Sequence, residues 1–289
     1  MMRVLVVTPM HNEAANVGPL AAQLEASTLQ PSLWVVVDDG STDGTAGLVR
    51  DLHMSFPVRL LTKSNDGGLI GGSAFKSWQA GLDSVRRDLE DYDAVMKLDA
   101  DVELPREYLE KVVAALKADV NVGLAGGLLR RHRDREQAFH VPGPVKLYSR
   151  AGFAALADLP RVVGFDVMDE VAIKRAGLEV RVLPELGFDV RRAIGASQGL
   201  IHGRRRNGVV CRWVGYDIVY FLLHAARYVA RRPYVVGGLA MLWGYVAAGA
   251  GPYAVDLRVA HAREQRRKLR AAMRRPIRWL RSAYAAPTT

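Results

Sequence analysis

A chain of 289 residues is long enough for one large domain or for a domain with an extension, and 49% hydrophobic with 24% charged residues exclude extensive disorder. Its single cysteine, Cys211, excludes an intrachain disulfide and is compatible with a reducing compartment. The net charge of +10 is unevenly placed, because residues 200–289 hold seventeen Lys or Arg against three acids and leave about −4 for the preceding 199 residues.

The first two thirds of the chain alternate short β-rich runs with amphipathic helical patterns. No long apolar stretch of a signal peptide precedes the first run, so we expect this part to remain in the cytoplasm. Strands are predicted at 3–8, 33–38, 58–62, 94–98, 122–129, 145–148 and 179–183, and helices at 16–25, 45–52, 73–85, 107–116 and 166–177. This order predicts an α/β fold with a mostly parallel sheet and helices on both faces.

Paired acids follow two of the predicted strands. Asp38 and Asp39 end the second strand and precede Gly40, and Asp99 and Asp101 follow the fourth. Carboxyl ends of parallel strands share one edge of a sheet, where open α/β folds bind ligands. Residues two apart in an extended segment point the same way, so Asp99 and Asp101 can approach one Mg²⁺ or Mn²⁺ and the diphosphate that it neutralises. A solvated turn at the strand end is the alternative.

The loop after the first strand, from Thr8 through Pro9 and Asn12 to Glu13, is also polar. It would lie beside Asp38 and Asp39, and its carboxylate and amide groups suit the imide N–H of a nucleobase and the hydroxyls of ribose. The alternative is that Asn12 or Asn16 caps the following helix.

A third acid cluster, Asp166, Asp169 and Glu170, opens the helix predicted at 166–177. Asp166 and Asp169 are three residues apart and share a helix face, so one of them could act as a general base toward an acceptor hydroxyl. Acids in the first turn also complement the helix dipole, which is the competing explanation.

Weaker features accompany these acids. The glycine run 67–72 lacks the spacing of a phosphate-binding loop and would serve close backbone approach, and Lys63 would touch the nucleotide or remain in solvent. His202 with Arg204, Arg205 and Arg206 forms a basic loop, 202–208, that could hold a leaving diphosphate or an acceptor phosphate, unless these arginines are merely solvated. A charged loop is expected at 130–135, and neither His132 nor His140 has the spacing of a metal ligand.

The C-terminal third has a different character. An apolar helix is predicted at 209–229, and residues 234–253 contain no charged residue. The second segment is long enough to span a bilayer, but its glycines equally favour a helix hairpin packed on the protein or at the membrane interface. Residues 263–281 interleave arginines with apolar residues and predict a basic interfacial helix, kinked near Pro276.

Together the motifs 9–13, 38–45, 98–101 and 166–177 resemble those of an inverting family 2 glycosyltransferase of the GT-A fold, over roughly residues 1–190. The resemblance implies that Pro9, Asn12 and Glu13 line the nucleotide pocket and that Asp39 recognises the base. It places Asp99 near ribose or phosphate, with Asp101 as the principal metal ligand.

The resemblance also implies an acid of the third cluster as base, for which we rank Asp169 first and Asp166 second. Many relatives carry an additional histidine ligand after the strand that follows this helix. Asp189, His202 or no side chain would fill that place here. The implied reaction is one in-line displacement, without a covalent sugar–enzyme intermediate.

The sequence therefore predicts a GT-A catalytic domain over residues 1–199 and a basic, apolar, helical region over 200–289. The expected partners are a UDP-, GDP- or dTDP-sugar, Mn²⁺ or Mg²⁺, and a hydroxyl acceptor that is polyprenyl-linked or part of a surface glycan. The basic region suits the anionic inner face of the cell membrane better than nucleic acid, because its arginines alternate with apolar residues. A nucleotidyltransferase on a similar sheet and a basic nucleic-acid-binding or membrane-binding protein are the alternatives.

Overall fold

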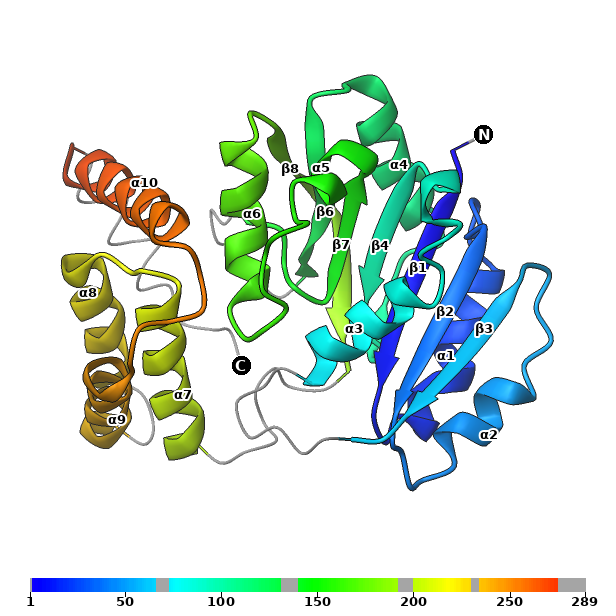
Figure 1. Ribbon diagram of the computed structural model, residues 1–289, viewed down its shortest axis with the longest axis horizontal. Coiled ribbons are helices and arrows are strands. Elements are labelled where there is room, and N and C mark those ends of the chain that lie inside the picture. Colours follow the sequence, from blue (N-terminus) through cyan, green and yellow to red (C-terminus); the bar gives the residue numbers. More distant parts are fainter. Residues whose placement is uncertain (1, 66–72, 131–139, 192–199, 230–233, 275–289) are drawn as a thin grey trace. The chain divides into compact units, whose positions relative to one another are not determined.

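The computed structural model describes residues 2–65, 73–130, 140–191, 200–229 and 234–274 (Figure 1). The chain divides into two compact units. The first comprises Met1–Asp166 and Ala172–Arg192, and the second comprises Val167–Val171 and Ala193–Thr289. A domain boundary after residue 199, as composition suggests, stays a prediction. The glycine run 67–72, residues 131–135 of the charged loop with His132, and the kink at Pro276 lie outside the described residues.

The first unit is built on an eight-stranded sheet with the order β3-β2-β1-β4-β7-β6-β8-β5. Its strands are β1 (Val4–Met10), β2 (Leu33–Asp39), β3 (Val58–Lys63), β4 (Ala94–Leu98), β5 (Val102–Glu103), β6 (Val122–Leu129), β7 (Val145–Ser149) and β8 (Glu179–Val190). Strands β3, β2, β1 and β4 are parallel to one another, and β6 and β8 are parallel. Strands β7 and β5 run antiparallel to their neighbours. The predicted mostly parallel sheet is confirmed.

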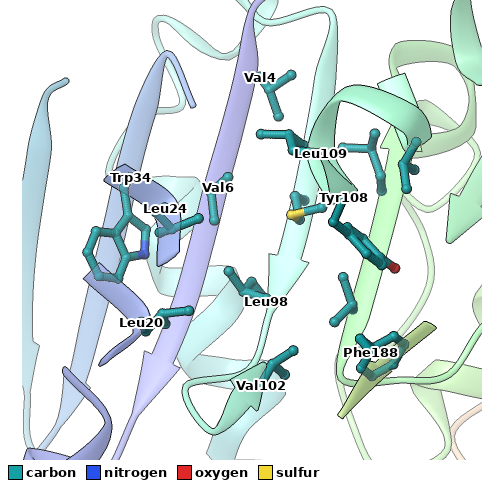
Figure 2. Close-up of a cluster of buried hydrophobic side chains, with 14 of the residues drawn as sticks. Val4, Val6, Leu20, Leu24, Trp34, Leu98, Val102, Tyr108, Leu109 and Phe188 are labelled. Atoms are coloured by element: carbon teal, nitrogen blue, oxygen red, sulfur yellow. The ribbon is translucent and has the colours of Figure 1, made fainter. Parts of the chain in front are cut away.

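Helices cover both faces of this sheet, which explains why its central strands are apolar along their whole length. The helices of the first unit are α1 (Ala14–Glu25), α2 (Thr45–Arg50), α3 (Ser73–Asp83), η1 (Leu89–Asp91), α4 (Tyr108–Ala118), α5 (Arg150–Ala154) and α6 (Phe165–Arg175), the last of which crosses into the second unit. Leu20 and Leu24 of α1 and Leu109 of α4 share a buried cluster with Val4 and Val6 of β1 (Figure 2).

Helix α3 lies on the opposite face of the sheet. Its Gly81 packs so closely that a Cβ atom there would stand 2.5 Å from Val7 Cγ1 and 2.9 Å from Val37 Cγ2. The alternation along β1 thus sends Val4 and Val6 to one layer and Val7 to the other. The sheet is therefore the middle layer of three.

Strand β8 is longer than predicted. The predicted strand 179–183 stops before Pro184, yet pairing with β6 resumes beyond this proline after a register shift, from Gly127↔Leu183 to Leu128↔Gly187. The extra residues form a bulge that removes the need for a ladder bond from proline, which has no N–H. Gly127 permits the bulge, because a Cβ there would stand 1.9 Å from Leu186 O.

Besides part of α6, the described residues of the second unit form four helices, which are α7 (Leu200–Trp213), α8 (Ile218–Val229), α9 (Tyr234–Ala247) and α10 (Val255–Arg274). Helices α7 and α9 cross in direct backbone contact, where a Cβ at Gly208 would stand 2.0 Å from Met241 O and one at Gly244 2.0 Å from Arg205 O. Among the described residues, no helix combines the length and apolar character needed to cross a membrane. Residues 234–253 do not form one uninterrupted helix, because α9 ends at Ala247.

Two C-terminal predictions were wrong. The basic loop 202–208 is part of α7, because its arginines are good helix formers and no proline interrupts them. The helix predicted at 209–229 is two helices. Gly215 adopts φ +73° between them, and the carboxylate of Asp217 accepts from Val219 N (3.0 Å) and Tyr220 N (3.3 Å) to cap α8.

Candidate functional site

The carboxyl ends of β1, β2, β3 and β4 meet at one edge of the sheet. In the register of these strands Met10 lies beside Asp38, and Asp39 lies beside Lys63. The loop that begins at His11 therefore runs next to the paired acids of β2, as the sequence predicts. Asp99 follows β4, which neighbours β1 on its other side.

Hydrogen bonds join the β1–α1 loop to the β2–α2 loop. Asn12 has φ +55°, and its backbone N donates to Ser41 Oγ (2.9 Å). Its side-chain Oδ1 accepts from Thr42 N (2.8 Å). Neither Asn12 nor Asn16 is the N-cap of α1, because Glu13 occupies that position and Asn16 lies inside the helix. The amide of Asn12 is therefore used to hold the two loops together.

Asp43 strengthens the same junction. Its carboxylate accepts from Ala14 N (2.9 Å), from Thr45 N (3.0 Å) and from the Thr45 hydroxyl (2.5 Å). The bond from the Thr45 hydroxyl is the largest influence that lowers the pKa of Asp43. Thr45 also accepts from Glu13 N (2.9 Å). These contacts, which join residues about thirty positions apart, set the position of Glu13.

Asp39 is the acid expected to recognise the base. It is 3% exposed, and the ammonium of Lys63 forms an ion pair with its Oδ1. His11 Nδ1 lies 2.7 Å from the backbone oxygen of Asp39. Lys63 thus contacts Asp39 within the protein, so the charge of this buried carboxylate is compensated before any ligand binds.

The glycine after these acids has a conformational role. Gly40 has φ +68°, and a Cβ atom there would stand 2.9 Å from Asn65 N. An L side chain would be strained in this backbone conformation and crowded by the segment that follows β3. The turn that carries Asp39 to the edge thus depends on glycine.

Thr8 and Pro9 occupy the last part of β1. Thr8 is fully buried and its Oγ1 accepts from Trp34 Nε1 (2.9 Å), while Pro9 is partly buried beside Val37. The hydroxyl of Thr8 is therefore committed to the core.

Asp99 and Asp101 stand at the end of β4. Lys97 forms an ion pair with Asp99, whose side chain remains 36% exposed. Desolvation raises the pKa of Asp99, Lys97 opposes this, and the charges of Asp101 and Asp166 raise it further. The three carboxylates are thus close enough to interact electrostatically.

The carboxylate of Asp101 accepts no hydrogen bond from the described residues, and only its backbone oxygen is engaged, by Arg191 N at 2.9 Å. Magnesium and manganese commonly bind one or two protein carboxylates and complete their shell with water and substrate phosphates. Within the described ranges, no group of three or more His, Cys, Asp or Glu side chains is arranged to hold a metal. Asp101, with Asp99 beside it, fits an open site in which water and substrate phosphates complete the coordination shell.

The third acid cluster lies on α6, after Gly164 with φ +89°. Asp166 is partly buried, its backbone oxygen accepts from Lys146 Nζ (2.6 Å), and its carboxylate faces Gly143. Asp169 is fully buried, and its Oδ1 accepts from Glu170 N (2.7 Å). The structure thus associates Asp166, within the first unit, with the acids after β4.

The candidates for an additional metal ligand belong to different units of the chain. Asp189 pairs with Arg130 (3.1 Å), and His202 is exposed on α7 in the second unit. Arg191 follows β8 and donates to Glu103 Oε1 (2.8 Å) and to Asn16 Oδ1 (3.4 Å). The strand end that would carry the family's histidine thus carries an arginine tied to two neighbouring elements.

The arginines of α7 lie in the second unit. The guanidinium of Arg204 stands over the ring of Tyr228, with Cζ 3.9 Å from its centroid, and Arg205 is exposed. A phosphate-binding role for His202, Arg204, Arg205 and Arg206 remains a prediction.

Sequence reasoning missed Lys97 and Lys146, which are 4% and 0% exposed beneath the acids. A signal was present, since a charged residue interrupts an otherwise apolar strand in each case. Lysine is rarely buried without a partner, so this position in a strand could have been flagged.

Comparison with known proteins gives three findings. Residues 5–179 match the family model described as glycosyl transferase family 2. Among curated relatives, the polyprenol monophosphomannose synthase of Mycolicibacterium smegmatis is 30% identical over 136 residues, 44% of this chain and 48% of the relative. The dolichol-phosphate mannosyltransferase of Pyrococcus furiosus is 27% identical over 198 residues, 65% of this chain and 51% of the relative. The chain thus spans about half the length of the curated relatives it matches.

Solved structures share the fold. The mannosyltransferase PcManGT from Pyrobaculum calidifontis, in complex with GDP-Man and Mn²⁺, has a TM-score of 0.57 at 22% identity, covering 98% of this chain and 84% of that chain. Glucosyl-3-phosphoglycerate synthase from Mycobacterium tuberculosis, in complex with Mn²⁺, UDP and glucosyl-3-phosphoglycerate, has a TM-score of 0.52 at 18% identity, covering 73% of this chain and 79% of that chain. The fold is therefore GT-A, and because the family model covers more than half of the sequence, the chain belongs to glycosyl transferase family 2.

Proposed function

We propose that the protein is an inverting glycosyltransferase that moves a sugar from a nucleoside-diphosphate donor to an acceptor by direct displacement. The observation that carries this proposal is the placement of Asp99, Asp101 and Asp166 at the strand edge, where the turn of Gly143 and Pro144 contacts both Asp99 and Asp166. This edge adjoins the joined loops of Asn12 and Asp39. Family membership favours this function over nucleotidyl transfer. The named activities of the relatives agree with it.

In this proposal the site residues have three roles, which are nucleoside binding, metal binding and proton acceptance. Asp39, with Pro9, Asn12 and Glu13, binds the nucleoside. Asp101 holds Mn²⁺ or Mg²⁺, which when bound neutralises charge on the diphosphate, and Asp99 lies beside it near the ribose or phosphate. When the acceptor attacks through a hydroxyl, the carboxylate at Asp166 or Asp169 accepts its proton. We now place Asp166 first, because a base must touch its substrate and Asp169 has no exposed surface.

Donor binding is tested by a thermal-shift screen of UDP, GDP and dTDP sugars with and without MnCl₂ or MgCl₂. A ligand at about one hundred times its Kd stabilises by roughly 2.7 kcal/mol, so one donor should raise Tm by several degrees when metal is present. Asp39→Asn should weaken binding of that donor about tenfold or more, because a charge-assisted hydrogen bond is lost.

The matched control for this screen is Asp158→Asn, which neutralises an exposed aspartate after α5 that has no described partner. Its Tm shift should equal that of the wild type. Equal donor affinity in Asp39→Asn and the wild type would contradict the assignment of Asp39.

We further propose that the acceptor is lipid-linked, such as a polyprenyl phosphate, and that the protein works at the cytoplasmic face of the cell membrane. The named relatives act on polyprenol or dolichol phosphates. In the second unit, large apolar side chains are exposed on all four helices: Ile201, Ile218, Val219, Leu222, Leu223, Tyr234, Val235, Val236, Leu239, Trp243, Val246, Val255, Val259 and Met273. Elsewhere in the described chain only Leu48 and Val120 belong to this class. Apolar side chains combined with the arginines of 200–289 suit an anionic lipid surface.

Membrane binding is tested by flotation with phosphatidylcholine vesicles, with and without phosphatidylglycerol. We expect the wild type to float with anionic vesicles and to be released by salt, since part of the attraction is electrostatic. The triple variant Leu222→Ser, Leu239→Ser, Trp243→Ser should float several-fold less, because exposed apolar area is removed without disturbing the core.

The matched control is Leu48→Ser with Val120→Ser, which removes the two large apolar side chains that are exposed among the described residues of the first unit. It should float as the wild type does. Equal flotation of the triple variant, or a preference for DNA in a gel-shift assay, would refute the lipid-facing role of the second unit.

A further inference from the structure

Two buried lysines lie directly opposite one another beneath the acids at the strand edge. Lys97 of β4 and Lys146 of β7 are partners in the antiparallel register, and they are 4% and 0% exposed. Removing an ammonium group from water is costly unless it is paired, so two such groups side by side indicate a specific use.

The contacts of Lys97 show what it holds. Its ammonium pairs with the carboxylate of Asp99, donates to Gly143 O (2.9 Å), and lies 5.7 Å from the ring centroid of Phe75. Lys146 differs, because its ammonium donates to the backbone oxygen of Asp166 (2.6 Å). The first lysine thus engages a carboxylate of the candidate metal site and the second engages the start of α6.

The turn before β7 connects these contacts. Asp99 N donates to Pro144 O (2.9 Å). A Cβ at the adjacent Gly143 would stand 3.1 Å from Asp166 Oδ2, so the turn packs against that carboxylate. One chain of contacts therefore runs from Asp99 through Lys97 and Gly143 to Asp166.

The carboxylates of Asp99 and Asp101 differ in whether they have a partner within the protein. The Asp99 carboxylate is occupied by a buried cation, whereas that of Asp101 accepts nothing from the described residues. A divalent cation that coordinated Asp99 would have to displace or repel Lys97. The same arrangement leaves Asp101 available.

We propose that Lys97 is a positioning residue. Its ion pair keeps the Asp99 carboxylate occupied and close to the Gly143 turn, so that a divalent cation coordinates Asp101 and not Asp99. This inference rests on the proposed function, because it assumes a metal at Asp101. Lys97 then sets the spacing between the donor side of the site and Asp166.

A double-mutant cycle on Mn²⁺ binding tests this role. The probe is Mn²⁺ alone, and the free ion is measured by electron paramagnetic resonance with the full-length chain. In the wild-type background, Asp99→Asn should change the Kd by less than about threefold, because Asp99 is not a ligand. Lys97→Met should tighten binding by about tenfold or more, because a nearby positive charge is removed and a carboxylate is released. Asp99→Asn in the Lys97→Met background should then weaken binding by about tenfold or more.

Lys146→Met is the matched control, because it removes a buried lysine whose described hydrogen bond is to the backbone oxygen of Asp166. In that background Asp99→Asn should again have an effect below about threefold. Melting temperature and near-ultraviolet circular dichroism identify any variant that fails to fold. If Lys97→Met does not fold, Asp99→Asn in the wild-type background still tests the proposal. A loss of Mn²⁺ affinity greater than about tenfold in that variant would make Asp99 a ligand and overturn the proposal.

Other results are equally decisive. An equal effect of Asp99→Asn with and without Lys97, or weaker Mn²⁺ binding in folded Lys97→Met, would assign Lys97 a structural role only. Mn²⁺ binding without coupling would leave the proposed function intact, whereas absence of Mn²⁺ binding in the wild type would overturn both.

Discussion

Asp101→Ala is expected to reduce sugar transfer by about 10³-fold or more, equivalent to about 4 kcal/mol of transition-state stabilisation. The reason is that Asp101 offers an oxygen ligand not already used by a described hydrogen-bond donor, at the edge where the donor diphosphate is expected. The same feature predicts little effect on folding. Loss of a side chain without such a bond should change the free energy of unfolding by no more than about 0.5 kcal/mol.

The measurement for Asp101→Ala is release of nucleoside diphosphate from the donor that stabilises the wild type, over a range of Mn²⁺ concentrations. Asp158→Ala, at an exposed position, is the control and should retain wild-type turnover. Turnover above about a tenth of wild type in Asp101→Ala would be inconsistent with a metal ligand, since that corresponds to less than 1.4 kcal/mol.

Asp166→Asn is the second large effect that we expect. With a hydroxyl acceptor, kcat should fall by about 10² to 10⁴, which is the usual contribution of a general base, while the KM for the donor changes little. With a polyprenyl phosphate acceptor the loss should be less than about tenfold, because a phosphate monoester has a second pKa of about 6 and its oxygen is ionised without a base at neutral pH. The variant therefore tests the residue and the acceptor class together.

Asp169→Asn is the matched variant for this experiment. Asp169 is fully buried and accepts from Glu170 N, so an isosteric amide should alter stability more than kcat. A large loss of kcat in Asp169→Asn together with near-normal turnover in Asp166→Asn, both with a hydroxyl acceptor, would restore the ranking that the sequence suggests.

Periodicity predicted the central sheet well and the C-terminal helices less well. The short, mostly apolar and β-branched runs of β1, β2 and β4 are typical of strands buried on both faces, and Val4, Val6 and Val7 show this burial directly. By contrast, the helix boundary between α7 and α8 depends on Gly215 and on the cap from Asp217, which are local signals inside a continuous apolar pattern. Before Pro184 the sequence predicts the end of a strand, but β8 continues beyond it because of a bulge opposite Gly127.

In the site, too, features that depend on neighbouring residues in the sequence were predicted, whereas contacts between residues far apart in the sequence were not. The acids that end β2 and those that follow β4 were predicted because strand ends are visible in the sequence and parallel strands bring them to one edge. The bond from Thr42 N to Asn12 joins residues thirty positions apart, and the bond from Lys97 to Gly143 joins residues forty-six positions apart. Such partners follow from the packing of loops, which has no period in the sequence.

By itself, the sequence determined the order of strands and helices, the family resemblance and the residue types at the strand ends, because these depend on local alternation of apolar and polar residues. Only the tertiary structure decided which carboxylates already have partners. Asp39 is paired with Lys63 and Asp99 with Lys97, while no described donor reaches the Asp101 carboxylate. The physical reason is that compensation of a charge depends on distances of a few ångströms between side chains, and those distances are set by sheet register and turn geometry rather than by spacing along the chain.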